Sequence, residues 1–180
     1  MKRTPVNLSN SRCVRLDAMW KPLPCGKWKG RVSSISSKNM VDKETVSKKL
    51  TRISEYLDEL MPFLAYDNHT LKTNKEKLRN VERIFQLIVD EACDINSHII
   101  AEKNFELPDD YRGSFTILGQ RLVLPLQFAE KIGVSVGLRN GIVHRYEKMD
   151  VDRMLNDIRQ NIGDYTEYVR HIKNVLDKEK

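Results

Sequence analysis

The side chains best suited to chemistry lie close together between residues 139 and 146. Arg139 carries a permanent charge and a planar set of donors that match phosphate oxygens. His144 can accept or donate a proton near neutral pH. Asn140 stands four residues before His144, so on a helix its amide could orient the imidazole ring. Tyr146 adds a hydroxyl group two residues further on.

Together these groups are suited to cleaving RNA without a metal ion. His144 would take the proton of a 2'-OH group, and the freed oxygen would attack the neighbouring phosphorus. Arg139 would stabilise the doubly negative phosphorane that follows. A structural interpretation stands beside this one, because cationic side chains near a helix C-terminus also complement the dipole and donate to the last carbonyls.

The spacing of the two residues restricts the catalytic interpretation. Arg139 and His144 are five residues apart, roughly 140° around a regular helix of about 3.6 residues per turn. Both can face one phosphate only if the helix ends or distorts near them, which Gly141 makes easier, or if a second copy completes the cleft. We therefore expect paired sites at a two-fold interface. Gly133 and Gly137 permit close helix approach, either in such a dimer or within the chain.

Long segments of helical periodicity flank these residues. Apolar side chains recur every three or four positions over residues 42–64, 73–102, 125–143 and 150–177. Residues 73–76 form a capping-box pattern, Pro125 suits a first helical turn, and Asp150 suits a cap. A polar turn is expected at 65–71 and a short helix near 108–118. The sequence predicts an all-α, up-and-down four-helix bundle with an extra short helix, forming a homodimer.

The charge is unevenly distributed along the chain. Residues 1–39 hold nine Lys and Arg against Asp17 alone, a balance of +8, whereas the remainder holds 22 basic and 24 acidic residues, or −2. If the folded part binds RNA, the binding must therefore depend on where individual basic side chains lie rather than on its net charge. The three cysteines show no metal-like spacing, so we expect no metal or cofactor and a cytoplasmic location. No run of about 18 apolar residues predicts a membrane span.

Residues 1–39 show no sustained periodicity and are rich in Ser, Pro, Gly and basic residues. We predict a disordered basic extension ahead of a helical domain at 40–180. One alternative is an arm that binds RNA, with Trp20 and Trp28 stacking on bases. Another is an extension that is not native, with Met40 as the true start.

The run from Gly137 to Tyr146 resembles the Arg-X4-His-X-Tyr signature of the HepT-like family, within the HEPN (higher eukaryotes and prokaryotes nucleotide-binding) domains. Residues 81–86, 92–102 and 107–112 are also similar to that family's second helix and following loop, and the resemblance covers residues 40–178. Two positions depart from the pattern. Gly141 stands where a larger residue is common, and Leu138 replaces a frequent aromatic, but neither removes a catalytic group.

The resemblance implies a dimeric, metal-independent endoribonuclease that acts as the toxin of a toxin–antitoxin pair. By this analogy Arg139 and His144 cleave RNA and Asn140 supports them. The partner would be a minimal nucleotidyltransferase antitoxin that transfers AMP from ATP to Tyr146. Two other functions remain open: a catalytically silent module that binds a nucleotide or protein partner, and a helical dimerisation domain whose motif only caps a helix.

Overall fold

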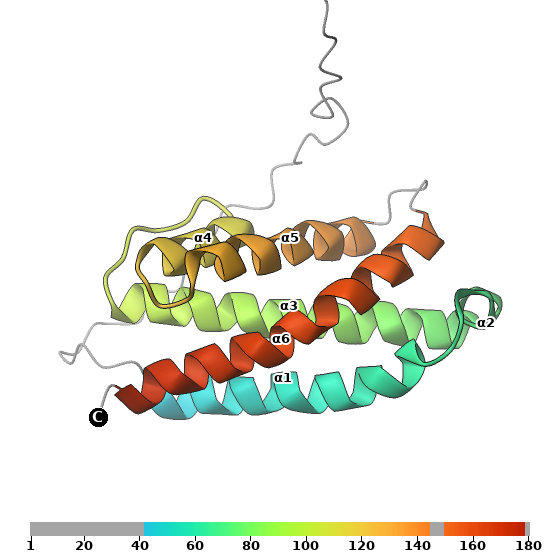
Figure 1. Ribbon diagram of the computed structural model, residues 1–180, viewed down its shortest axis with the longest axis horizontal. Helices are drawn as coiled ribbons and strands as arrows, with labels where there is room; N and C mark the ends of the chain where they lie inside the picture. Colours follow the sequence, from blue (N-terminus) through green and yellow to red (C-terminus); the bar gives the residue numbers. More distant parts are fainter. Residues whose placement is uncertain (1–41, 145–149, 179–180) are drawn as a thin grey trace, which may run out of the picture. The chain divides into compact units, whose positions relative to one another are not determined.

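The computed structural model describes residues 42–144 and 150–178, whose regular structure is entirely helical, as the sequence predicts. This part of the chain folds into six helices, labelled in Figure 1. They are α1 (Lys43–Leu64), α2 (Asn68–Thr73), α3 (Lys75–Glu102), α4 (Tyr111–Gln120), α5 (Leu126–Val143) and α6 (Val151–Lys178). None of them is long and apolar enough to cross a membrane.

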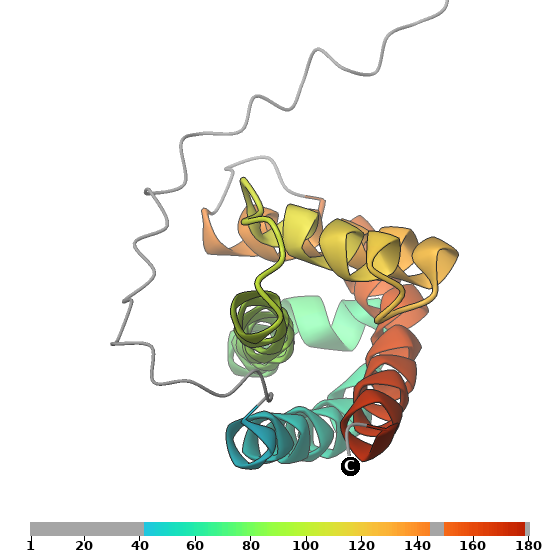
Figure 2. The ribbon, with the colours of Figure 1, turned by 90° about the vertical axis from the view of Figure 1, so that its left-hand side faces the viewer.

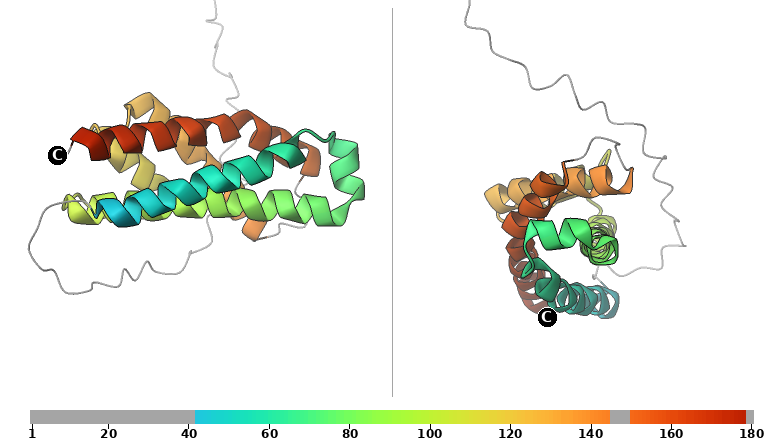
Figure 3. Two further views of the ribbon diagram at one scale, coloured as in Figure 1. Left: turned by 90° about the horizontal axis from the view of Figure 1, so that it is seen from below. Right: turned by 90° about the vertical axis from the view of Figure 1, so that its right-hand side faces the viewer.

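The four long helices form an up-and-down bundle. Going around the bundle, α1 packs on α3, α3 on α5, α5 on α6 and α6 on α1 (Figure 2). Successive long helices run in opposite directions, which confirms the predicted bundle. The short α4 folds back on α5 and α3, and α2 connects α1 to α3 at the far end (Figure 3).

Side-chain caps determine where several helices begin. The Asp42 carboxylate accepts the backbone N–H of Thr45, and Asp150 accepts that of Asp152 at 2.9 Å, as predicted for Asp150. The predicted capping box at residues 73–76 is wrong in detail. Asn74 caps α3, accepting from Lys77 N–H at 3.0 Å, because Thr73 is the last residue of the preceding helix.

The predicted polar turn at residues 65–71 is also wrong, since α2 occupies Asn68–Thr73. This short helix is capped by Asp67 and buries Leu71. The connection that leads to it is held by α6. Arg159 donates from Nη2 to the carbonyl of Tyr66 at 2.7 Å, from Nε to that of Leu64 at 3.2 Å, and from Nη1 to the side chain of Asn68. One guanidinium therefore fixes the turn between α1 and α2.

Buried polar bonds lock α3, α4 and α6 together. Tyr168 is fully buried, and its hydroxyl donates to Asn96 Oδ1 at 2.7 Å. The Asn96 amide in turn donates to Ser114 Oγ at 3.1 Å. Burial raises the pKa of Tyr168 well above its ordinary value, because the phenolate would lose its hydration. This neutral network holds the framework on which α5 rests.

Two contacts hold the first half of α5. Lys131 lies 2.6 Å from the carboxylate of Asp164 on α6, with the two side chains 60% and 9% exposed. On the other side α4 approaches α5 closely: a Cβ on Gly119 would stand only 2.9 Å from the Cβ of Ala129. The helix that carries the motif is thus clamped between α4 and α6.

Candidate active site

Arg139 lies near the end of α5, and its side chain is turned inward toward α3. Only 18% of that side chain is exposed. Its Nη2 donates to Oδ2 of Asp90 at 3.0 Å, and its Nε lies 2.8 Å from Oδ1 of the same carboxylate. The Nε–H does not point along this second contact, which is therefore an electrostatic one. Asp90 therefore contacts one side of the guanidinium. It was not among the site residues predicted from the sequence.

Asn140 accepts hydrogen bonds from both Arg139 and His144. Its Oδ1 accepts a hydrogen bond from Nη1 of Arg139 at 3.2 Å, and its backbone carbonyl accepts from the N–H of His144 at 3.0 Å. The amide was expected to orient the imidazole ring. In the structure its oxygen is engaged with the guanidinium, and its bond to His144 runs through the backbone.

His144 is the C-cap of α5 and is exposed to solvent. The helix ends at Val143, inside the motif. A helix end here is one of the arrangements expected to let Arg139 and His144 face the same phosphate. Within residues 42–144 and 150–178, no hydrogen bond or ion pair joins these two side chains. Tyr146 belongs to the 145–149 segment, outside the described residues.

The outer face of α5 is open in the single chain. Among the described residues, a Cβ on Gly137 would meet no atom outside its own stretch of helix within 4 Å, and Val134, one turn earlier, is 55% exposed. Gly133, by contrast, faces α4, where an added Cβ would lie 3.5 Å from Arg112 Cγ. The two glycines therefore have different surroundings: Gly133 serves a contact within the chain, and Gly137 lies on the uncovered face, two helical turns before His144.

The acidic residues that follow Asp90 on α3 are directed elsewhere. Glu91 and Asp94 both bind Lys49 of α1, at 2.8 and 2.9 Å. Cys93 is buried beside them. Burial raises the pKa of its thiol far above the ordinary value, and the charge of Asp90 raises it further. A buried, protonated thiol is a poor nucleophile, so Cys93 is part of the core rather than of the site.

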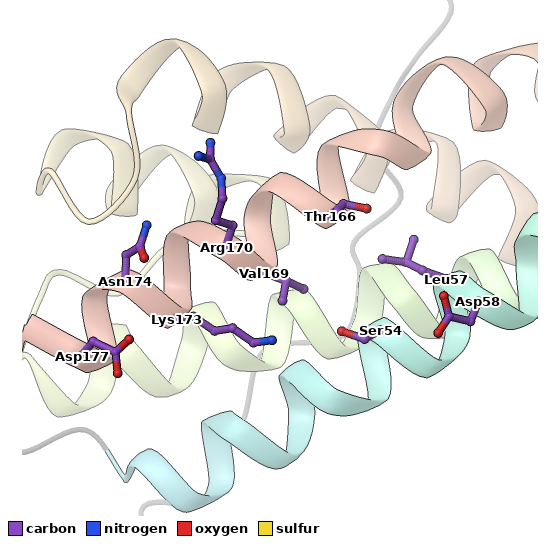
Figure 4. A pocket seen from close by; sticks show the side chains of 9 residues that line it. All are labelled: Ser54, Leu57, Asp58, Thr166, Val169, Arg170, Lys173, Asn174 and Asp177. Carbon is purple, nitrogen blue, oxygen red and sulfur yellow. The ribbon is translucent and has the colours of Figure 1, made fainter.

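A pocket of about 550 Å³ lies away from the motif, between α1 and α6. Figure 4 shows Lys173 extending along the space between these two helices. The charged residues of its lining are Asp58, Arg170, Lys173 and Asp177, two of each sign. Because these charges balance, the pocket offers no cationic surface to nucleic acid. The end of α5 therefore remains the candidate site.

The chain is similar to known proteins over most of its length, not only at the motif. A family model described as "Ribonuclease HepT-like" matches residues 53–172, a range that includes Arg139, His144 and Tyr146. The chain is 32% identical over 138 residues to the tRNA nuclease HepT of Aphanizomenon flos-aquae, covering 73% of this chain and 89% of the relative. It is 31% identical over 84 residues to the mRNA nuclease HepT of Shewanella oneidensis, covering 46% and 63%.

The fold is shared with solved structures. A tri-AMPylated Shewanella oneidensis HEPN toxin in complex with MNT antitoxin superposes with a TM-score of 0.68 at 22% identity, covering 73% of this chain and 98% of the toxin. The cytosolic protein YutE from Bacillus subtilis superposes with a TM-score of 0.68 at 17% identity, covering 78% and 94%. At these identities the likeness is one of fold.

Proposed function

The chain belongs to the HepT-like ribonuclease family, and from this premise we propose that it is a metal-independent endoribonuclease toxin of a toxin–antitoxin pair, acting in the cytoplasm. We assign cleavage to Arg139 and His144, with Asn140 in support. One observation carries the assignment. The helix ends within the motif, between Arg139, whose guanidinium is bonded to the Asn140 side chain, and His144, whose imidazole is exposed and whose backbone N–H bonds to the Asn140 carbonyl.

The proposed reaction uses only these side chains and the RNA itself. The imidazole of His144 takes the proton from a 2'-OH group, whose oxygen then attacks the adjacent phosphorus. The P–O bond to the next nucleotide breaks, giving a 2',3'-cyclic phosphate and a leaving 5'-oxygen, which becomes a hydroxyl by taking up a proton that balances the one His144 accepted. Arg139 donates to the phosphorane oxygens as their charge develops.

A second copy of the chain is expected to complete the site. Within the described residues Arg139 is turned toward α3, His144 is exposed and no bond joins the two side chains, which favours a cleft shared with a second chain. The uncovered face of α5 at Val134 and Gly137 offers an apolar surface with room for close helix approach. A two-fold contact on this face would place two motifs along one cleft.

The proposed antitoxin is a minimal nucleotidyltransferase that neutralises the toxin by modification. The hydroxyl oxygen of Tyr146 attacks the α-phosphorus of ATP, the bond to pyrophosphate breaks, and the phenol proton passes to solvent. The AMP group adds negative charge and bulk two residues after His144. It would repel RNA phosphates from Arg139 and obstruct the cleft. The AMPylated, antitoxin-bound state of the Shewanella oneidensis toxin supports this part of the proposal.

Cleavage of total RNA or tRNA in the presence of EDTA tests the nuclease assignment. The purified full chain should cut, and Arg139→Ala and His144→Ala should each abolish cutting. Arg170→Ala and His69→Ala are matched controls, because they remove the same side chains from exposed positions on α6 and α2. Activity that required a divalent metal, or that survived Arg139→Ala, would reject the mechanism. A tight antitoxin complex without any cleavage would indicate a binding module instead.

A further inference from the structure

The contact between Asp90 and Arg139 points to a role for Asp90 in the reaction. The carboxylate lies along the Nε and Nη2 side of the guanidinium, at 2.8 and 3.0 Å. Asn140 accepts from Nη1. The guanidinium carries one N–H on Nε and two on each terminal nitrogen, so the bonds within residues 42–144 and 150–178 leave one N–H on Nη1 and one on Nη2. Guanidinium N–H groups match the oxygens of a phosphate.

The placement of Asp90 sets it apart from the other acids on the same stretch of α3. Glu91 binds Lys49 and Arg52, and Asp94 binds Lys49, so both carboxylates face α1. Asp90 is 49 residues from Arg139 in sequence, and the two helices that carry them are packed together in the bundle. The anchor for the guanidinium therefore comes from a long, rigid helix rather than from the motif itself.

A carboxylate beside the catalytic cation has two opposing effects. Its negative charge weakens the attraction between Arg139 and RNA phosphates, so it does not improve affinity. Its fixed position, however, removes rotamer freedom from a long side chain and points the remaining donors in one direction. Its contribution is therefore expected in the chemical step rather than in binding.

We propose that Asp90 is a positioning residue for RNA cleavage: it holds Arg139 by one edge so that the two remaining N–H groups meet the scissile phosphate. The inference rests on the proposed nuclease function. It differs from that function in assigning a role to a residue outside the motif, which acts only through Arg139.

Steady-state cleavage of tRNA by Asp90→Asn, which keeps the size of the side chain and removes its charge, tests this role. We expect kcat to fall at least tenfold, because the guanidinium of Arg139 is no longer held in one orientation. KM should stay constant or fall, because no carboxylate charge then weakens the attraction of Arg139 for RNA phosphates. Asp90→Glu, which restores the charge, should recover part of kcat. Asp94→Asn, one turn further along α3 and paired with Lys49, is the matched control and should retain wild-type kcat.

Thermal unfolding of each variant separates positioning from folding. The proposal is overturned if Asp90→Asn cleaves like the wild type while Arg139→Ala is inactive, a result that leaves the nuclease assignment intact. It is also overturned if kcat falls equally in Asp94→Asn, or if Asp90→Glu matches Asp90→Asn in kcat at an unchanged unfolding temperature. If Arg139→Ala itself still cleaves, the proposed function fails first.

Discussion

Ser135 of α5 and Tyr165 of α6 share a buried hydrogen bond of 2.6 Å between their side-chain oxygens. The Ser135 hydroxyl also lies 2.6 Å from the carbonyl of Ile132, to which it donates, so the phenol is the donor to Ser135. Arg139 stands one helical turn further along α5. This contact with α6 therefore helps to fix the rotation of α5 about its own axis, and with it the side of the helix from which Arg139 extends toward α3.

Tyr165→Phe should lower the free energy of unfolding by about 1–2 kcal/mol, because the Ser135 oxygen loses its buried donor. Urea denaturation measures the loss. Tyr66→Phe is the matched control: Tyr66 is 42% exposed, and removing its hydroxyl should change stability by less than about 0.5 kcal/mol. Equal effects in the two variants would show that the Ser135 contact contributes nothing.

Gly137→Gln tests the proposed dimer. An added Cβ at this position meets no atom within 4 Å in the described part of the chain beyond its own stretch of helix, and glutamine favours helix over glycine by roughly 0.5–1 kcal/mol, so the folded chain should not be destabilised. By analytical ultracentrifugation we expect the wild type to have twice the 21.0 kDa mass of one chain and the variant to have the mass of one chain. The variant should also lose RNA cleavage. Gly163→Gln, on an equally open part of α6, should do neither. A dimeric, active Gly137→Gln variant would place the interface elsewhere.

Tyr146→Phe tests the proposed modification. Co-expression of the wild-type chain with the proposed nucleotidyltransferase antitoxin should give intact masses raised in steps of one AMP group, and the modified chain should not cleave RNA. Tyr146→Phe should show no addition, because it lacks the attacking hydroxyl, whereas Tyr66→Phe should be modified normally. An unmodified Tyr146 in a neutralised complex would limit the antitoxin to steric blocking.

The Cys93 thiol should be inert in the folded protein. Burial raises its pKa, so the thiol stays protonated at pH values near the ordinary 9.0, where a free thiol is half ionised. In a Cys13→Ser/Cys25→Ser variant, Ellman's reagent should react at pH 8.5 only after urea is added. Because only the unfolded chain ionises as the pH rises past 9.0, this thiol also lowers stability at alkaline pH. Rapid labelling of the native variant would contradict the assigned burial.

The long helices were predictable because apolar residues recur at helical spacing over many turns. Residues 150–177 were expected to form the last helix with Asp150 as its cap, and the structure places α6 at Val151–Lys178. The short α2 could not be found in this way. Six residues are too few to display a period, and α2 depends on the Asp67 cap and on the burial of Leu71 against other helices.

The site was predictable only where it is local in sequence. Residue types and spacing single out Arg139 and His144 and call for a helix end or distortion near them, or for a second copy; the structure places a helix end at Val143. Nothing near the motif signals Asp90, because its contact with Arg139 depends on how α3 and α5 pack. The different surroundings of Gly133 and Gly137 likewise follow from the position of α4, which periodicity does not encode.

The hydrogen bonds from Arg159 to the turn between α1 and α2 have a consequence for folding during synthesis. Its three bonds join residues 91 to 95 positions apart, and their donor belongs to the last helix. During translation the first connection therefore waits for a side chain on the last of the four long helices. A truncated polypeptide that stops before residue 159 leaves these acceptors to water, so the bundle closes only after this part of α6 has been made.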